Sequence, residues 1–350
     1  MTGLSRGRRV ARVLQRALLL LVGAGLVALA AFRGAACRRE HDVARDAAPK
    51  GGRFVTAADV TIYLQEAGGT DAPAILFVHG TGAWSETWRG AMNAVAAAGF
   101  HAVAIDLPPF GYSGRPADGG YGKREQGRRI VGALDSLGID QVVLVGHSFG
   151  GGPTVEATLL APDRVRALVL VDAALSIGTG TEPAPPPSAL VRGVLAVPPL
   201  RDALVAGFLS NPRFTRRLLL SFVADPAAAT PERVAVYQRP LSVEGTTRAM
   251  GEWLPALLVP AEKAASEDPA AYARLTMPLL LIWGERDTVT PLAQGRRLAS
   301  LAPHAELSVL DGVGHIPQIE APERFDELLV KLVAPTSRSG AGSGSRRPAP

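Results

Sequence analysis

The segment Val142-Val143-Leu144-Val145-Gly146-His147-Ser148-Phe149-Gly150-Gly151 joins an uninterrupted apolar run to a serine between two glycines. The apolar run predicts a buried strand, and the small residues that follow are compatible with a helix. Gly146 and Gly150 flank Ser148 with residues that leave room for a tight turn. The pattern Gly-x-Ser-x-Gly therefore predicts a strand, a sharp turn and a helix. Such a turn lifts the Ser148 hydroxyl clear of the sheet edge, at the N-terminus of a helix.

Composition and charge limit the classes of protein that this chain can be. It has 350 residues, of which 47% are hydrophobic and 20% charged, as in a folded protein with one large or two modest domains. The net charge of +5 arises from the two ends, because residues 1–50 carry +7, residues 335–350 carry +3 and the body carries −5. We therefore expect no nucleic-acid binding. Cys37 is the only cysteine, so no internal disulfide forms, and no histidine has metal-ligand spacing.

The N-terminal residues have the pattern of a targeting segment. Five arginines between residues 6 and 16 precede an uncharged run from Ala17 to Phe32, which Arg33 closes. This order predicts that residues 1–37 are either a signal peptide or an uncleaved membrane anchor, although 16 apolar residues are fewer than the roughly 20 that span a bilayer. Both alternatives predict membrane contact through residues 17–32 and a folded part that is exported or anchored outside the cytoplasm. Residues 38–52, which are charged and contain glycine, are expected to be a linker.

Strand and helix patterns alternate through most of the remaining chain. This alternation predicts an α/β fold with a mostly parallel sheet and helices on both faces, in two parts at residues 53–175 and 276–334. The expected strands are 53–56, 60–65, 74–78, 101–105, 141–145, 165–171, 278–284 and 305–310, and the expected helices are 84–98, 123–137, 149–160, 291–301 and 322–333.

The region 176–275 interrupts this alternation. A loop rich in Gly, Pro and Thr at 178–187 precedes expected helices at 188–196, 200–209, 212–224, 231–238 and 246–258, with no convincing strand between them. We expect a helical cap inserted between the sixth and seventh strands. The cap is interpreted as a lid over the carboxyl ends of the strands, and a space-filling helical subdomain is the alternative. Residues 335–350, in which Ser, Gly, Arg and Pro dominate, predict a disordered tail.

Three residues with complementary chemistry each follow an expected strand, in the order Ser148, Asp287, His315. A serine hydroxyl is a poor nucleophile at neutral pH and needs a base, which in turn needs an anion to orient it. The chain resembles the α/β-hydrolase superfamily over about residues 53–334. The resemblance rests on His79-Gly80-Thr81-Gly82, Gly146-His147-Ser148-Phe149-Gly150, Trp283-Gly284-Glu285-Arg286-Asp287 and Gly314-His315.

The resemblance implies a role for each of these positions. Ser148 is the expected nucleophile, His315 the general base and then acid, and Asp287 the residue that orients His315. The backbone N–H groups of Thr81 and Phe149 are the expected oxyanion donors. Some relatives carry the acid after the sixth strand, where Asp172 stands, so Asp172 is the alternative acid.

Neighbouring residues are expected to support the site rather than to react. His147 is expected to pack beside the turn, His79 to shape the oxyanion loop and Asp106 to be structural. The aromatic residues Trp84, Trp88 and Phe149 are interpreted either as the lining of a pocket or as core.

The implied activity is hydrolysis of an ester or related acyl compound through an acyl-enzyme, without a metal or cofactor. The apolar cap suggests a small-molecule substrate with an apolar group. Carbon–carbon bond hydrolases and cofactor-free perhydrolases use the same triad and remain alternatives. Two further hypotheses are a non-catalytic ligand-binding protein with this fold and, from the N-terminal segment alone, a component of a membrane assembly.

Overall fold

The computed structural model describes residues 3–116, 118–178, 187–260 and 262–333. The expected tail at 335–350 and most of the expected loop at 178–187 lie outside these residues.

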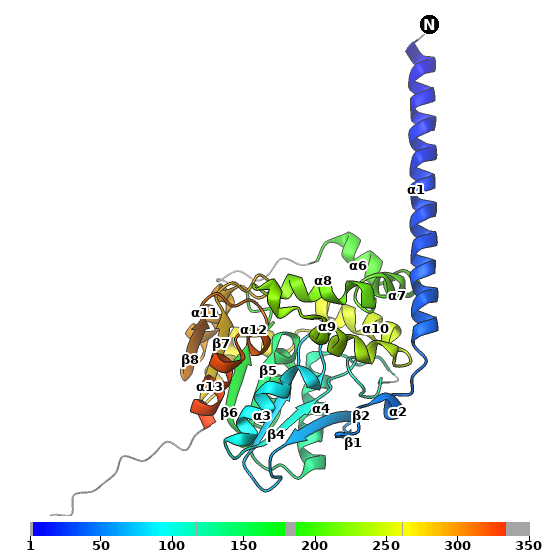
Figure 1. Cartoon of the computed structure of the whole chain (residues 1–350). Coiled ribbons are helices and arrows are strands. Elements are labelled where there is room, and N and C mark those ends of the chain that lie inside the picture. Colours follow the sequence, from blue (N-terminus) through cyan, green and yellow to red (C-terminus); the bar gives the residue numbers. More distant parts are fainter. Residues whose placement is uncertain (1–2, 117, 179–186, 261, 334–350) are drawn as a thin grey trace, which may run out of the picture.

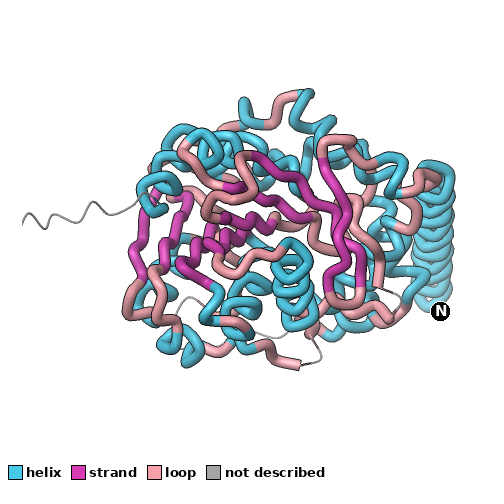
Figure 2. The backbone as a smooth tube through the Cα atoms, turned by 90° about the horizontal axis from the view of Figure 1, so that it is seen from below, coloured by secondary structure: helices cyan, strands magenta, loops and turns pink. Residues whose placement is uncertain are grey.

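One sheet contains eight strands in the order β1-β2-β4-β3-β5-β6-β7-β8 (Figure 2). Strand β2 is antiparallel to β1 and to β4, and the other neighbours are parallel. The bounds are β1 Gly52–Ala57, β2 Val60–Ala67, β3 Ala74–Val78, β4 His101–Ile105, β5 Val142–His147, β6 Val165–Val171, β7 Leu279–Gly284 and β8 Ala305–Leu310.

Helices cover both faces of this sheet (Figure 1). Buried residues of α4, α5 and α11 belong to one apolar cluster on the sheet, and those of α3 and α13 belong to a second cluster. The bounds are α3 Arg89–Ala97, α4 Lys123–Leu137, α5 Gly151–Leu160, α11 Leu292–Leu301, α12 Pro317–Glu320 and α13 Pro322–Val333, with short 3₁₀ helices η1 Ser85–Trp88, η2 Ser148–Gly150 and η3 Pro162–Arg164. These elements confirm the predicted α/β fold class.

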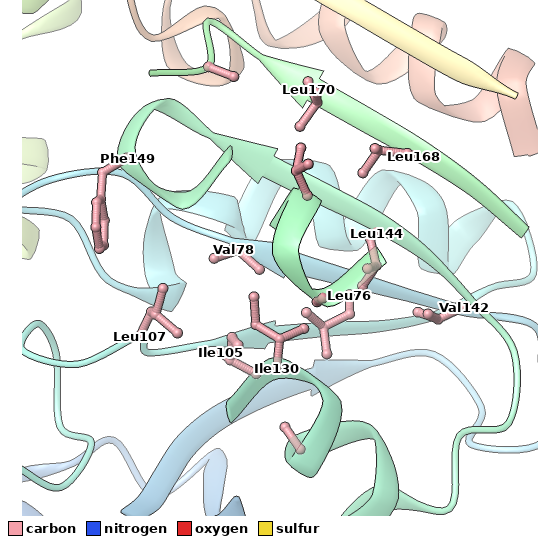
Figure 3. Packing of buried hydrophobic residues seen from close by; sticks show 14 of the residues in the cluster. Leu76, Val78, Ile105, Leu107, Ile130, Val142, Leu144, Phe149, Leu168 and Leu170 are labelled. Carbon is pink, nitrogen blue, oxygen red and sulfur yellow. The ribbon is translucent and has the colours of Figure 1, made fainter. Parts of the chain in front are cut away.

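The central strands are apolar without interruption because both of their faces are buried. In β3, Leu76 and Val78 pack into the cluster that contains α4, while Ile75 and Phe77 pack into the cluster that contains α3. This distribution follows from the two-residue period of a strand. Figure 3 shows Leu76 and Val78 among the side chains of the first cluster, together with Leu144 of the neighbouring strand β5.

The helical insertion follows β6 and ends before β7, as the sequence predicts. We call the described residues 187–260 and 262–275 the cap. Its elements are α6 Ala189–Leu195, α7 Pro198–Gly207, α8 Pro212–Phe222, η4 Pro226–Ala228, α9 Pro231–Gln238, η5 Arg239–Ser242, α10 Thr246–Leu258, η6 Ala265–Glu267 and η7 Pro269–Arg274. Figure 1 shows α8, α9 and α10 above the end of the sheet where β5 stops.

The N-terminal segment differs from the expectation. Helix α1 runs from Gly3 to Arg39, well beyond the apolar run at 17–32, and its part from Arg12 is long and apolar enough to cross a membrane by length and composition. Residues 38–52 are not a free linker. They contain the end of α1 and α2 Ala44–Ala47, and Asp42 pairs with Val243 of the cap as an isolated β-bridge.

The end of β7 offers a test of this packing. A Cβ on Gly284 would overlap the backbone carbonyl of Gly314, which has no flexible side chain to move away. We expect Gly284→Ala to lower the free energy of unfolding by about 1–3 kcal/mol, in the range of overpacked cores. Thermal unfolding of the purified full chain in detergent measures the change.

Gly90→Ala is the matched control, because nothing lies within 4 Å of a Cβ at this exposed position in α3. Alanine also favours a helix over glycine, so this variant should be as stable as the parent or slightly more stable. Equal stability of Gly284→Ala and Gly90→Ala would show that the close approach of β7 to Gly314 does not exist.

Candidate active site

Ser148 lies in a turn that few residues other than glycine adopt. Its φ is +51°, in the left-handed region, directly after the end of β5. The flanking residues must be glycines because a side chain would not fit there, as well as because the turn is tight. A Cβ on Gly146 would lie 2.8 Å from the Thr154 Cβ, and a Cβ on Gly150 would lie 2.5 Å from the His79 carbonyl oxygen. The predicted strand, turn and helix are therefore present.

The structure brings Ser148, His315 and Asp287 into one hydrogen-bonded chain. The Ser148 Oγ lies 2.8 Å from the His315 Nε2, and the His315 Nδ1 lies 2.8 Å from the Asp287 Oδ2. All three residues are buried. With a proton on Nδ1, His315 donates to the carboxylate and accepts from the serine hydroxyl. This tautomer places the base lone pair on the nucleophile.

The Asp287 carboxylate is held by several donors. Its Oδ1 accepts from the backbone N–H groups of Val289, at 2.7 Å, and Thr290, at 3.0 Å, and its Oδ2 lies 2.6 Å from the Thr290 hydroxyl. Burial favours the neutral acid, but the hydrogen bonds from His315 and from Thr290 outweigh it and lower the pKa of Asp287 to about 2. The group is therefore an anion near neutral pH. We did not predict from the sequence that Thr290 binds the Asp287 carboxylate. The one local signal for this role is its position three residues after Asp287.

Asp172, the alternative acid, lies in the same cluster but has a different environment. It follows β6 with φ +41°, and its Oδ1 accepts from the Gly284 N–H at 2.9 Å. Its Oδ2 is buried and has no hydrogen-bond partner among the described residues. Burial, followed by the neighbouring Asp287, raises the pKa of Asp172 well above its ordinary value. Its surroundings thus favour the protonated form of Asp172, and it makes no hydrogen bond to His315 in the part of the chain that the structure describes.

The ligand atoms of Asp172, Asp287 and His315 lie within 4.8 Å of one another, a spacing at which a metal ion can be considered. The hydrogen bonds argue for a different interpretation. His315 Nδ1 is directed at Asp287, and the Asp287 oxygens accept from Val289 and Thr290. The His315 and Asp287 atoms that could bind a metal ion are therefore already engaged in hydrogen bonds, as in a catalytic triad.

The expected oxyanion donors lie on two loops that meet at Ser148. Phe149 follows the serine, and a Cβ on Gly80, one residue before Thr81, would lie 2.9 Å from the Ser148 Cβ. No hydrogen bond from the Thr81 N–H occurs among the described residues. Both N–H groups therefore belong to backbone that passes the nucleophile at contact distance.

The neighbouring histidines make supporting contacts. His79 Nε2 accepts from the Leu107 N–H at 2.8 Å and its Nδ1 donates to the Gly80 carbonyl at 2.9 Å, and burial lowers its pKa to about 4. His147 Nε2 donates to the His315 carbonyl at 2.7 Å, and burial, with His315 nearby, lowers its pKa to about 3. Both are neutral rings near neutral pH that fix backbone on either side of the nucleophile.

Asp106 likewise holds backbone rather than reacting groups. Its Oδ1 accepts from the Ser85 N–H and its Oδ2 from the Tyr112 N–H, both at 2.7 Å. Two buried loops are thereby fixed to the end of β4.

The loop that carries His315 is attached to the cap, which the sequence did not indicate. The His315 N–H donates to the Phe222 carbonyl at the end of α8, at 2.7 Å. The Glu320 carboxylate accepts from Gly314 N–H at 3.1 Å and, on the cap side, from Ala224 N–H at 2.7 Å. The position of the base therefore depends on the cap.

A cavity of about 20 Å³ lies between the oxyanion loop and the cap. That volume holds about one water molecule, so the cap and the oxyanion loop leave little open space between them. The lining is apolar apart from hydroxyl groups and backbone, and it consists of Thr81, Gly82, Leu209, Thr215, Leu218, Leu219, Phe222, Tyr237, Leu241 and Met250.

The three aromatic residues considered as pocket lining are core residues. Trp84 packs on Tyr112 and donates to the Val236 carbonyl, Trp88 packs between Phe77 and Phe325, and Phe149 packs on Phe110 and Trp253. The cap and the far face of the sheet cover them, so the core interpretation is correct and the lining interpretation is wrong.

A larger hollow of about 480 Å³ lies elsewhere, between residues 119–125 and the end of α10. It contains none of the triad residues. The triad residues do not line the small cavity either, but it borders Thr81 of the oxyanion loop and Phe222, whose carbonyl accepts from the His315 N–H, and we therefore assign it to the site.

Several known proteins similar to this chain are named as hydrolases. The 2-hydroxymuconate semialdehyde hydrolase of Pseudomonas putida is 31% identical over 82% of this chain and 95% of the relative. A meta-cleavage product hydrolase from Pseudomonas fluorescens is 28% identical, with a TM-score of 0.62, over 80% of this chain and 96% of that one. A bacterial membrane phospholipase A is 25% identical, with a TM-score of 0.62, over 91% of this chain and 96% of that one.

The family comparison agrees with the geometry. A family model described as the alpha/beta hydrolase fold matches residues 73–322, which include strands β3 to β8 and the cap. On this match and on its similarity to known hydrolases over most of its length, the chain belongs to the α/β-hydrolase family.

Proposed function

We propose that this protein is a membrane-anchored serine hydrolase that cleaves carboxylic esters with uncharged, apolar acyl groups. The observation that carries the proposal is the hydrogen-bonded chain from Ser148 through His315 to Asp287. Asp172 remains the alternative acid, and no cofactor takes part.

The proposed mechanism follows from this chain. His315 Nε2 takes the proton of Ser148 as its oxygen attacks the ester carbonyl, and the Asp287 carboxylate stabilises the resulting imidazolium. The N–H groups of Thr81 and Phe149 stabilise the oxyanion. His315 then gives its proton to the leaving alcohol, which leaves an acyl group on Ser148. Water, activated by His315, releases the acid and restores the serine.

The substrate class is inferred from the cavity. The names of several relatives indicate carboxylate substrates, such as a 2-hydroxy-6-oxononadienedioate. None of the cavity-lining residues that the structure describes is charged. A carboxylate placed there without a cation would lose its hydration at a cost of several kcal/mol. Carbon–carbon bond and peroxide chemistry on the same triad stay as alternatives, but the apolar lining favours an uncharged acyl group.

The anchoring is inferred from α1 and from the extent of one similarity. Residues 13–32 contain one charge, Arg16, and are long enough for a span when that arginine reaches the interface. A match over 91% of the chain, as with the membrane phospholipase A, must include residues before Arg53. The cap acts as a lid in this proposal, because a cavity of about 20 Å³ admits no ester without movement of the cap.

A matched pair of esters tests the substrate class. The p-nitrophenyl ester of a straight-chain fatty acid and the p-nitrophenyl monoester of a dicarboxylic acid of the same length differ in one terminal carboxylate. We expect kcat/KM to be higher for the uncharged ester by about 100-fold or more, because the cavity cannot compensate the buried charge. Ser148→Ala should abolish both activities. Equal rates, or preference for the charged ester, would point instead to the carboxylate substrates named for the relatives.

A pair of asparagine variants tests the acid. Asp287→Asn should lower kcat by up to about 10⁴-fold, because the amide no longer stabilises the imidazolium or selects its tautomer. Asp172→Asn should change kcat by a few-fold at most, since Asp172 does not contact His315 and its surroundings favour the neutral carboxyl, which the amide resembles. Thermal melts establish that both variants fold. A larger loss for Asp172→Asn than for Asp287→Asn would assign the role to Asp172.

A further inference from the structure

The end of α1 is fixed to the cap rather than joined to it by a flexible tether. Arg39 Nε donates to the Leu241 carbonyl at 3.0 Å. The Glu40 carboxylate, whose side chain is 6% exposed, accepts from the N–H of Thr247 at 3.1 Å and from its hydroxyl. Asp42 adds two backbone hydrogen bonds, to Ser242 and from Glu244, both at 3.0 Å. The end of α1 and the cap are therefore fixed relative to each other.

The cap meets α1 at the level where its apolar run ends. Phe32, the last residue of that run, lies against Gly207 at the end of α7, where a Cβ would be 3.2 Å from its ring. The next residue, Arg33, borders a hollow together with Pro198 and Pro199 at the start of α7. Helix α7 thus lies at the height where a spanning α1 would leave the hydrocarbon. Figure 1 shows α6 and α7 on the side of the body from which α1 projects.

This side of the cap exposes apolar side chains. Outside α1, eight large hydrophobic residues are exposed in the described chain, and four of them fall within residues 190–208. The exposed fractions are 76% for Leu190, 37% for Val191, 48% for Val197 and 55% for Phe208. We call these four residues the α6–α7 face. Large apolar side chains concentrated in this way are typical of an interaction surface.

Positive charge accompanies the apolar residues. Residues 188–224 contain five arginines and one acidic residue, Asp202, whereas the body of the chain carries a net negative charge. Arg213, Arg216 and Arg217 of α8 are exposed. Apolar side chains combined with exposed arginines that form no ion pair among the described residues match a bilayer surface with acidic headgroups, to which each arginine contributes about 1 kcal/mol.

We propose that the α6–α7 face lies against the membrane that α1 spans, with the arginines of α8 at acidic headgroups. The proposal rests on the membrane anchoring proposed above and does not depend on the reaction. It also gives a short route for substrate, because Phe208 of this face precedes Leu209, which lines the cavity at the oxyanion loop. An ester dissolved in the bilayer would then reach the cap without crossing water.

Site-specific fluorescence in vesicles tests the proposal. The full chain carries Cys37→Ser, so that a single environment-sensitive dye can be attached at Leu190→Cys or Phe208→Cys. Asp140→Cys is the control, because it is exposed in the loop before β5, at the edge of the sheet opposite the cap. Leu20→Cys, in the apolar run, reports whether α1 is in the bilayer. The vesicles contain phosphatidylcholine, an acidic phospholipid and a spin-labelled lipid quencher.

We expect the dyes at residues 190 and 208 to be quenched several-fold more than the dye at residue 140, and more strongly with the acidic lipid than without it. Quenching at residue 20 with none at 190 and 208 would overturn the α6–α7 contact while leaving the anchor intact. Absence of quenching at residue 20 would overturn the anchor itself. A blue shift at 190 and 208 without lipid quenching would show a protein partner, such as a second copy of the chain, and would also contradict the proposal. None of these readouts requires ester hydrolysis.

Discussion

The turn at Ser148 constrains everything around it. A serine with φ +51° is strained by about 1–2 kcal/mol, and such a conformation persists where its surroundings determine it. Here the surroundings are two loops in contact. Gly150 approaches the His79 carbonyl and Gly80 approaches Ser148 itself, so neither position has space for a side chain. In this turn the serine oxygen lies 2.8 Å from the His315 Nε2.

The cap is part of the site and not a separate cover. The base is held from the cap side by the Phe222 carbonyl and, through Glu320, by Ala224. On its other side the cap is held by Arg39 and Glu40 at the end of α1. Hydrogen bonds thus fix the cap to the end of α1 on one side and to the loop of His315 on the other. Any movement that opens the cavity has to carry or break these bonds, so in the proposed lid mechanism access to Ser148 and the position of α1 are linked.

Much of this architecture was predictable because it leaves local patterns. Continuous apolar strands, glycines around Ser148 and polar residues directly after strands gave the fold class and the triad candidates. The supporting residues leave no such pattern. Glu320 meets Ala224 across 96 positions, and Glu40 meets Thr247 across 207. Residues 38–52 were expected to be a linker because charge and glycine usually indicate solvent, yet here a carboxylate pairs with cap backbone. Likewise, Trp84 is a core residue because α9 covers it. This contact depends on the tertiary structure.

In the proposed mechanism, the Ser148 Oγ carries the acyl group. Acid quenching of the full chain within the first turnover of an uncharged p-nitrophenyl ester, followed by mass spectrometry of its peptides, tests this most directly. We expect a burst of p-nitrophenol and one acyl group attached to the peptide that contains Ser148. Release of p-nitrophenol with no adduct on that peptide, or with the adduct on another residue, would contradict it.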